Sequence, residues 1–159
     1  MEVTSIHKNV VSFEIEDKTG ATFFTKTIII ASGKQPRRLG IIGEDKFFGK
    51  GVAVCATCDA PLYKQKDVVV VGGGNSAMDA VLALSKVARN ISVVNVNDEL
   101  VGDDILKSKI SSLPHVKFYH KTKALEILGD KFVTGIKVQT LGQSEQVIEA
   151  SGIFVEIGY

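Results

Sequence analysis

The sequence predicts an α/β fold built on a parallel β-sheet, and two observations indicate it. A run of four valines, Val68–Val71, leads directly into Gly72–Gly74, and a helical pattern follows from Ser76 to Ala88. A second β-branched run, Ile91–Val94, completes the order strand, glycine turn, helix, strand, which is the repeating unit of parallel sheets. The 159 residues suffice for one compact domain, or for one domain and a piece of another.

An antiparallel β-segment is predicted ahead of this unit. Its elements are, in order, a half-buried strand over residues 10–16, a turn over 17–20, a return strand over 21–27 and a short buried strand over 28–31. The last strand is inferred from the β-branched run Ile28–Ile30, which Ser32 and Gly33 interrupt. Glycine, proline and mixed charge over residues 34–51 indicate a connection with one short helix.

The rest of the chain completes the α/β part. Its elements are, in order, a helix over residues 105–113, a strand over 116–119, a β-meander over 124–128, 132–139 and 146–149, and a buried strand over 153–157. The helix after the glycines has one apolar face, formed by Ala77, Val81, Leu84 and Ala88. We therefore expect three layers: a β-meander, a parallel sheet and helices.

The glycine turn has the spacing Gly72-x-Gly74-x-x-Ala77, which is typical of dinucleotide-binding turns. The first glycine permits a tight turn, the second lets the backbone approach a pyrophosphate, and the small third residue lets helix and strand pack closely. Phosphates then bind at the helix N-terminus, where Asn75 and Ser76 can add donors. The alternative is a purely structural glycine turn, but the flanking strand and helix favour dinucleotide binding.

The residues after the second strand bear on the choice between NADH and NADPH. An acidic residue there favours NADH, whereas a nearby arginine accommodates the 2′-phosphate of NADPH. Asn95 can hydrogen-bond the ribose hydroxyls, and residues 90–106 include four acidic residues and no lysine or arginine. Arg89 is predicted to lie at the opposite end of the strand. Because a 2′-phosphate would meet repulsion here, we predict a preference for NADH.

The chain has two cysteines, Cys55 and Cys58, three residues apart. On a helical turn this spacing places both sulfurs on one face, where they can form a disulfide. A cysteine at a helix N-terminus has a stabilised thiolate, and the neighbouring carboxyl of Asp59 can exchange a proton with it. From the residues alone, an inert buried pair or half of a shared metal site is the alternative. The three histidines show no paired ligand spacing, so no metal site is expected.

Composition argues against several functional classes. The net charge of +1 gives no case for binding nucleic acid or an acidic membrane surface. The sequence has no apolar run of membrane-spanning length, and its charged N-terminus does not resemble a secretory signal. We therefore expect a soluble, cytoplasmic protein.

Together these motifs resemble the nicotinamide domain of low-molecular-weight thioredoxin reductases and, equally, the flavoprotein subunit of alkyl hydroperoxide reductase. The resemblance rests on Cys55–Asp59, a short spacer, the strand Val68–Val71 and the turn Gly72–Ala77. The segment Asp59–Lys64 and the missing basic residues after the second strand lean toward the peroxide-reductase subunit. The resemblance covers nearly the whole chain and implies a Rossmann-like nicotinamide domain.

The resemblance also implies residue roles. Cys58 would face the flavin and receive its electrons, Cys55 would attack the disulfide of a protein substrate, and Asp59 would be the acid–base partner. The nicotinamide dinucleotide would be surrounded by Gly72, Gly73, Gly74, Asn75, Ser76, Ala77, Asp79 and Asn95. Further cofactor contacts would be Ala31, Ser32 and Gly33, in a segment similar to one that touches FAD, and Ile157 and Gly158, where the family's chain leaves the nicotinamide domain.

By the same resemblance, residues 1–51 are expected to be part of an FAD-binding domain, comprising a β-meander and a linker. Residues 52–159 are expected to be an NAD(P)-binding domain that carries the redox-active cysteines. No Gly-x-Gly-x-x-Gly occurs before residue 50, and the family's C-terminal FAD segment is missing. We therefore expect a fragment of a protein that is a homodimer when complete.

Three functional hypotheses follow. The first is an FAD-dependent disulfide reductase that passes electrons from NAD(P)H through flavin to Cys55–Cys58 and on to a thioredoxin-like or peroxiredoxin-system protein. The second is a dinucleotide-binding module or redox sensor without activity as an isolated fragment, which the absorbance of bound flavin would separate from the first. A zinc-binding adaptor is the third, and it would have only two cysteine ligands.

Overall fold

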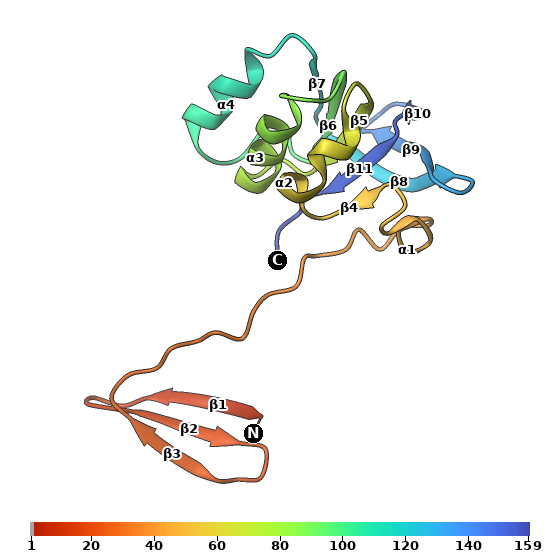
Figure 1. The fold of residues 1–159 in the computed structure, drawn as a ribbon. Coiled ribbons are helices and arrows are strands. Elements are labelled where there is room, and N and C mark those ends of the chain that lie inside the picture. Colours follow the sequence, from red (N-terminus) through yellow and green to blue (C-terminus); the bar gives the residue numbers. More distant parts are fainter. Residues whose placement is uncertain (1) are drawn as a thin grey trace. The chain divides into compact units, whose positions relative to one another are not determined.

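The computed structural model describes residues 2–159, which form two compact units, the first ending at Lys34 and the second beginning at Gln35 (Figure 1). The first unit is an antiparallel sheet in the order β1-β2-β3. Its strands are β1 (Val3–Lys8), β2 (Phe13–Asp17) and β3 (Thr22–Thr25). Asp17 fixes the turn after β2, because its Oδ1 accepts hydrogen bonds from the backbone N–H groups of Thr19 and Ala21.

One expectation for this unit is wrong. The buried strand predicted over residues 28–31 is absent, and Ile29 and Ile30 are 92% and 76% exposed. An apolar run forms a buried strand only where a neighbouring strand supplies hydrogen-bond partners. Among residues 2–159, no strand pairs with this segment. Conversely, the sequence pattern does not predict β1, which forms by pairing with β2 although few of its residues are apolar.

The second unit is built on a five-stranded sheet in the order β4-β11-β5-β6-β7, with every neighbouring pair parallel. Its strands are β4 (Val52–Ala53), β5 (Asp67–Val71), β6 (Asn90–Val94), β7 (Val116–Tyr119) and β11 (Gly152–Val155). The last strand in the sequence, β11, therefore lies between β4 and β5, which are the first two strands of this sheet in sequence order.

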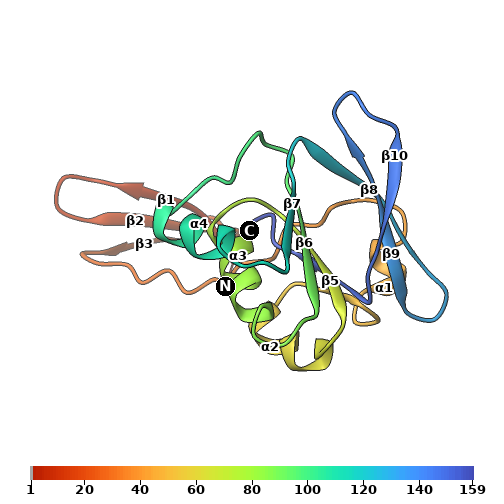
Figure 2. The same ribbon diagram turned by 90° about the horizontal axis from the view of Figure 1, so that it is seen from above.

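Two layers cover the parallel sheet on opposite faces, as the sequence predicts (Figure 2). The helices on one face are α2 (Ala56–Asp59), the 3-10 turn η1 (Ala60–Tyr63), α3 (Asn75–Leu84) and α4 (Asp104–Ser111). The other face carries α1 (Glu44–Phe47) and the meander strands β8 (Thr122–Gly129), β9 (Val133–Thr140) and β10 (Glu145–Glu149). None of these helices, within residues 2–159, is long and apolar enough to cross a bilayer.

The four-valine run explains how the sheet sits between the two layers. Val68 and Val70 pack in the core formed with the helices, whereas Val69 and Val71 pack in the core formed with the meander. Alternate side chains of a strand point to opposite faces, so a strand covered on both faces must be apolar throughout. The predicted apolar face of α3 is also buried, although the helix ends at Leu84 and Ala88 lies beyond it.

Most of the connection expected over residues 34–51 packs with the second compact unit, which begins at Gln35. Glu44 holds them there: its buried carboxylate accepts hydrogen bonds from the backbone N–H groups of Leu39 at 3.0 Å and Gly40 at 2.8 Å. The same carboxylate forms an ion pair with Nε of Arg38 at 3.3 Å. The backbone N–H of Ile127 on β8 donates to the carbonyl of Ile42. The contact with β8 joins this segment to the second unit.

Replacing Glu44 with alanine should lower the free energy of unfolding by about 2–3 kcal/mol, because the backbone N–H groups of Leu39 and Gly40 lose their acceptor and Arg38 loses its buried partner. Asp45→Ala is the matched control, since this neighbouring carboxylate also contacts Arg38 but its side chain is 97% exposed. Asp45→Ala should lower the free energy of unfolding by less than about 0.5 kcal/mol. Urea unfolding followed by circular dichroism measures both values, and equal losses would contradict the assignment of Glu44.

Candidate functional site

The turn between β5 and α3 is the tight glycine turn that the spacing predicts. Gly72 has a φ of +144°, and a Cβ at this position would lie 2.2 Å from the backbone carbonyl oxygen of Glu156. A Cβ at Gly73 would lie 2.3 Å from Oδ1 of Asn95. Ala77 is fully buried beneath the turn, where a small side chain allows α3 to approach it. The turn therefore depends on three close approaches that larger residues would prevent.

A cavity of about 720 Å³ opens at this turn. It lies where the C-terminal ends of the parallel strands meet, which is the usual ligand position in open α/β sheets. The predicted cofactor residues that line it are Gly72, Gly73, Gly74, Asn75, Ser76, Asn95, Ile157 and Gly158. Leu39, Ile41 and Val94 add apolar surface to its wall. The structure thus brings most of the expected dinucleotide contacts around one space.

Five expected cofactor residues lie outside the lining of this cavity. Ala77 is buried under the turn, and Asp79 is exposed on α3. Ala31, Ser32 and Gly33 belong to the first compact unit, in an exposed segment without regular secondary structure.

Two asparagines of the cavity wall shape the loop that follows β6. Asn95 is 1% exposed, its Nδ2 donates to the carbonyl of Glu99 at 2.7 Å, and its Oδ1 accepts from the N–H of Asn97 at 3.1 Å. Oδ1 of Asn75 accepts from the N–H of Asp103 at 2.9 Å. The Asn95 side chain therefore fixes the start of the β6–α4 loop internally, and the Asn75 side chain connects the end of this loop to the glycine turn.

Sequence reasoning missed two cations in the cavity wall, Arg37 and Lys123. Neither belongs to the loop after β6, on which the predicted cofactor preference rests. Lys123 reaches the cavity because β8 begins beside the end of β6: the backbone N–H of Thr122 donates to the carbonyl of Asn95 at 2.9 Å. Lys121, two residues earlier, forms an ion pair with Asp98 at 3.0 Å. No local sequence pattern indicates this proximity, which depends on how the meander folds back.

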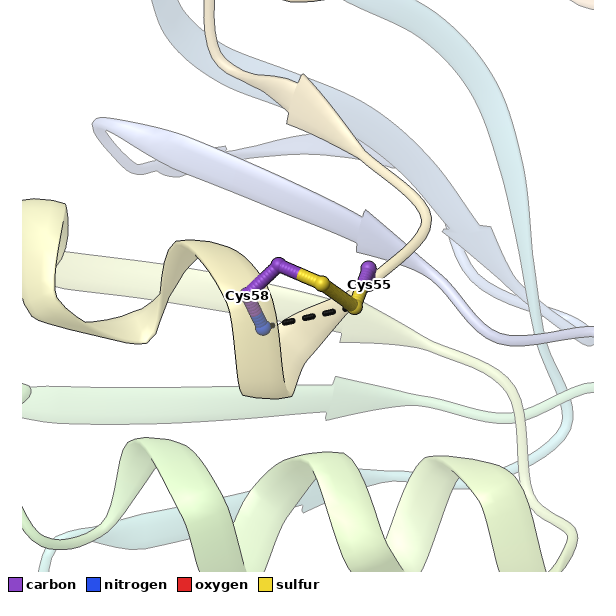
Figure 3. The surroundings of a disulfide bond; sticks show 2 residues. All are labelled: Cys55 and Cys58. Carbon is purple, nitrogen blue, oxygen red and sulfur yellow. Dashed lines mark hydrogen bonds between the residues drawn. A yellow bond between two sulfur atoms is a disulfide. The ribbon is translucent and has the colours of Figure 1, made fainter.

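Cys55 and Cys58 form a disulfide at the start of α2, with their Cα atoms 5.4 Å apart (Figure 3). Cys55 is the N-cap of this helix, and its Sγ accepts a hydrogen bond from the backbone N–H of Cys58 at 3.3 Å. Cys58 is exposed and Cys55 is partly buried. An N–H group directed at a sulfur stabilises the thiolate that appears when the disulfide is reduced.

Asp59 ends α2 and is partly buried. It lies near Tyr63, whose hydroxyl pKa is raised, first by burial and then by the negative charge of Asp59. The Tyr63 ring packs edge-on against Phe154 of β11, with centroids 5.0 Å apart. The segment that carries the cysteines is thus fixed to the sheet by a buried aromatic contact.

Strand register places the disulfide and the glycine turn at the same edge of the sheet. Ile153 of β11 pairs with Val52 of β4 on one side and with Val69 of β5 on the other. Parallel neighbours run in the same direction, so this register continues beyond the strand ends. Three residues further on, this register aligns Glu156 with Gly72, which directly follows β5, and with Cys55, which is the second residue beyond the end of β4. The N–H of Glu156 still donates to the carbonyl of Val71 at 2.8 Å.

The described residues 2–159 contain no group of three histidine, cysteine or carboxylate side chains arranged to hold a metal ion. The groups that the structure brings together at this edge of the sheet are the Cys55–Cys58 disulfide, neighbouring carboxyls and a cavity with a glycine-rich wall.

Comparisons with known proteins agree with this geometry. The chain is 39% identical over 160 residues to an alkyl hydroperoxide reductase subunit of Staphylococcus epidermidis, and 36% identical over 159 residues to that of Staphylococcus aureus. Each alignment covers 99% of this chain but 31% of the relative, so the chain spans about a third of the length of these relatives.

Solved thioredoxin reductases have the same fold. The Giardia duodenalis enzyme has a TM-score of 0.86 at 29% identity, covering 98% of this chain and 52% of that one. The thioredoxin reductase of T. acidophilum has a TM-score of 0.79 at 34% identity, covering 99% and 52%. Residues 1–159 also match the family described as pyridine nucleotide-disulphide oxidoreductase. The chain therefore belongs to the pyridine nucleotide-disulphide oxidoreductase family, with the Rossmann-like fold and redox-active disulfide that its sequence predicts.

Proposed function

We propose that this chain is the dinucleotide-binding and dithiol portion of an FAD-dependent disulfide reductase. It would pass electrons from NAD(P)H to Cys55–Cys58 and on to a thioredoxin-like or peroxiredoxin-system protein. The observation that carries the proposal is the position of the disulfide and the glycine-turn cavity at one edge of one sheet, separated by a single strand. The names of the relatives support the proposed partners. We further propose that the complete protein is a cytoplasmic homodimer.

The cavity fits a nicotinamide dinucleotide. The glycine turn presents its backbone without side chains, and α3 begins at Asn75 with N–H groups that suit a pyrophosphate. When bound, the dinucleotide supplies a hydride. By the family resemblance, residues Ala31–Gly33 of the first unit would contact FAD. The chemistry of the chain's own residues is disulfide exchange.

In that exchange, the reduced pair acts as a two-electron donor. The Cys55 thiolate attacks one sulfur of the substrate disulfide, which breaks and leaves a mixed disulfide. The Cys58 thiolate then attacks the Cys55 sulfur, so that the Cys55–Cys58 disulfide forms again and the substrate leaves as a dithiol. Two electrons and two protons pass to the substrate in total. Asp59, next to Cys58, would hold and release a proton during these steps.

We also propose that NADH is preferred over NADPH. Val96 and Asn97 are exposed and line the cavity at the end of β6, where a 2′-phosphate would need a basic partner. Lys121 is occupied by its ion pair with Asp98. Two cations remain in the wall, Arg37 and Lys123. The Nε of Arg37 donates to the main-chain oxygen of Tyr159 at 3.1 Å, and Lys123 is a single flexible ammonium without the paired donors with which a free guanidinium binds phosphate.

Gly74→Ala should abolish most dinucleotide binding without unfolding the chain. A Cβ at Gly74 would come no closer than 3.9 Å to protein, so the fold tolerates it, whereas a bound pyrophosphate would meet the methyl group. We expect the Kd for NADH to rise by about tenfold or more in isothermal titration. Ser144→Ala, at an exposed residue between β9 and β10 that does not line the cavity, is the control. Unchanged NADH affinity in Gly74→Ala would contradict the assignment of the cavity.

The double substitution Val96→Arg and Asn97→Arg should shift the ratio of NADPH to NADH affinity by about tenfold toward NADPH, because two guanidinium groups can bind the 2′-phosphate. The matched control adds the same charge at Gln146 and Val147, exposed residues of β10 outside the cavity. Fluorescence titration of both variants with each dinucleotide gives the ratio. Parent protein that binds NADPH more tightly than NADH would overturn the proposed preference.

A mixed disulfide with a thioredoxin-like protein should form through Cys55. The Cys58→Ser chain cannot resolve such an adduct, and the Sγ of Cys55 is the sulfur that accepts a backbone hydrogen bond. Incubation with thioredoxin activated by thionitrobenzoate, followed by a non-reducing gel and mass spectrometry, measures adduct formation. We expect the adduct with Cys58→Ser and little with Cys55→Ser. The reverse pattern would exchange the proposed roles of the two cysteines.

A further inference from the structure

The side chain of Glu156 has no role in the disulfide exchange proposed above. This residue is the first after β11, the strand between the disulfide-bearing β4 and the glycine-turn strand β5. Its backbone is fixed on the β5 side by the hydrogen bond to Val71 and by close approach to Gly72. Its carboxylate interacts on the β4 side with the backbone N–H of Ala56, the residue that follows Cys55. It also lines the cavity.

Arg37 and Lys123 line the same cavity as this carboxyl, but no ion pair within residues 2–159 compensates its charge. Among the described residues, no lysine or arginine forms an ion pair with Glu156. The neighbouring strand residues on β4 and β5 are apolar, and the charge that α3 contributes is that of Asp79. Burial raises the pKa of Glu156, the Ala56 N–H lowers it, and the charge of Asp79 raises it.

We propose that Glu156 is a positioning residue for disulfide exchange, whose carboxylate beside the Cys55 end of the pair holds the Cys55 thiol in its protonated form. The inference rests on the proposed function. When the disulfide gains two electrons, the S–S bond breaks and each sulfur becomes a thiol or a thiolate. The Glu156 carboxylate, next to the Ala56 N–H, disfavours a second negative charge on the Cys55 sulfur. Its effect on the Cys55 thiolate is therefore opposite to that of the Cys58 N–H, which stabilises the thiolate.

The consequence is a dithiol that takes up more protons when it is reduced. Stabilising the thiolate makes a disulfide more oxidising, so a carboxylate that destabilises the thiolate makes the pair a better reductant. That direction suits a protein whose pair must pass electrons onward. Asp59 is the carboxyl that follows Cys58, so each cysteine would have a carboxyl of its own.

The test reads the Cys55 thiol directly, in a chain whose other cysteine is replaced by Cys58→Ser. The rate of alkylation by iodoacetamide is measured from pH 5 to pH 10, and its midpoint reports the thiol pKa. We expect Glu156→Gln to lower this midpoint by about half a pH unit or more, because a neighbouring negative charge is removed. Glu149→Gln, an exposed carboxyl on β10, removes the same charge elsewhere and should leave the midpoint unchanged.

Two further variants separate charge from packing. Glu156→Asp keeps a carboxylate and should keep a midpoint closer to that of the parent, whereas Glu156→Ala should behave like Glu156→Gln. Equal midpoints in the parent, Glu156→Gln and Glu156→Ala would overturn the proposal. If Glu156→Gln does not fold by circular dichroism, equal midpoints for Glu156→Asp and Glu156→Ala overturn it. The assay needs no flavin, dinucleotide or partner protein, so its outcome is distinguishable from a failure of the proposed function.

Discussion

The parallel pairing of β11 with both β4 and β5 is the constraint on which the site depends. β11 is the last strand in the sequence but the second in the sheet, and its register aligns the chain after each neighbour. Without it, the cysteine segment after β4 and the glycine turn after β5 would have no fixed relation. Buried contacts secure this position: Phe154 is fully buried and packs against Tyr63. Gly152 leaves the space that the Tyr63 ring occupies.

The polar residues at this edge of the sheet are of two kinds, those that hydrogen-bond the protein's own backbone and those that carry an unpaired charge. Asn75 and Asn95 use their side chains to hold the loop after β6, so they shape the cavity wall from within the protein. Glu156 and Lys123 direct charge toward the site without an ion-pair partner among the described residues. Satisfied hydrogen bonds thus set the shape of the loop, and the two charges are left available to a ligand or to the disulfide, which is the basis of the proposal for Glu156.

Much of the second unit could be predicted from the sequence because its signals are local. Four consecutive valines require burial on both faces, and three glycines before a helix require a tight turn. Features that depend on long-range pairing could not be found in this way. Ile28–Ala31 looks like a buried strand but has no pairing partner among residues 2–159, whereas β4 has two residues and forms because β11 pairs with it. Lys123 and Glu156 likewise reach the site through strand order, which no local pattern encodes.

The most direct test of a shared sheet edge is a backbone amide NMR spectrum of the 15N-labelled chain titrated with NADH. We predict shifts at Gly72–Ser76, where the cavity is, and smaller shifts at Glu156 and Ala56, which connect it to the disulfide. Amides of β1, β2 and β3, whose residues do not line the cavity, are the internal reference. Saturable binding that leaves the glycine-turn amides unchanged, or no binding, would contradict the claim that one sheet edge serves both the dinucleotide and the dithiol.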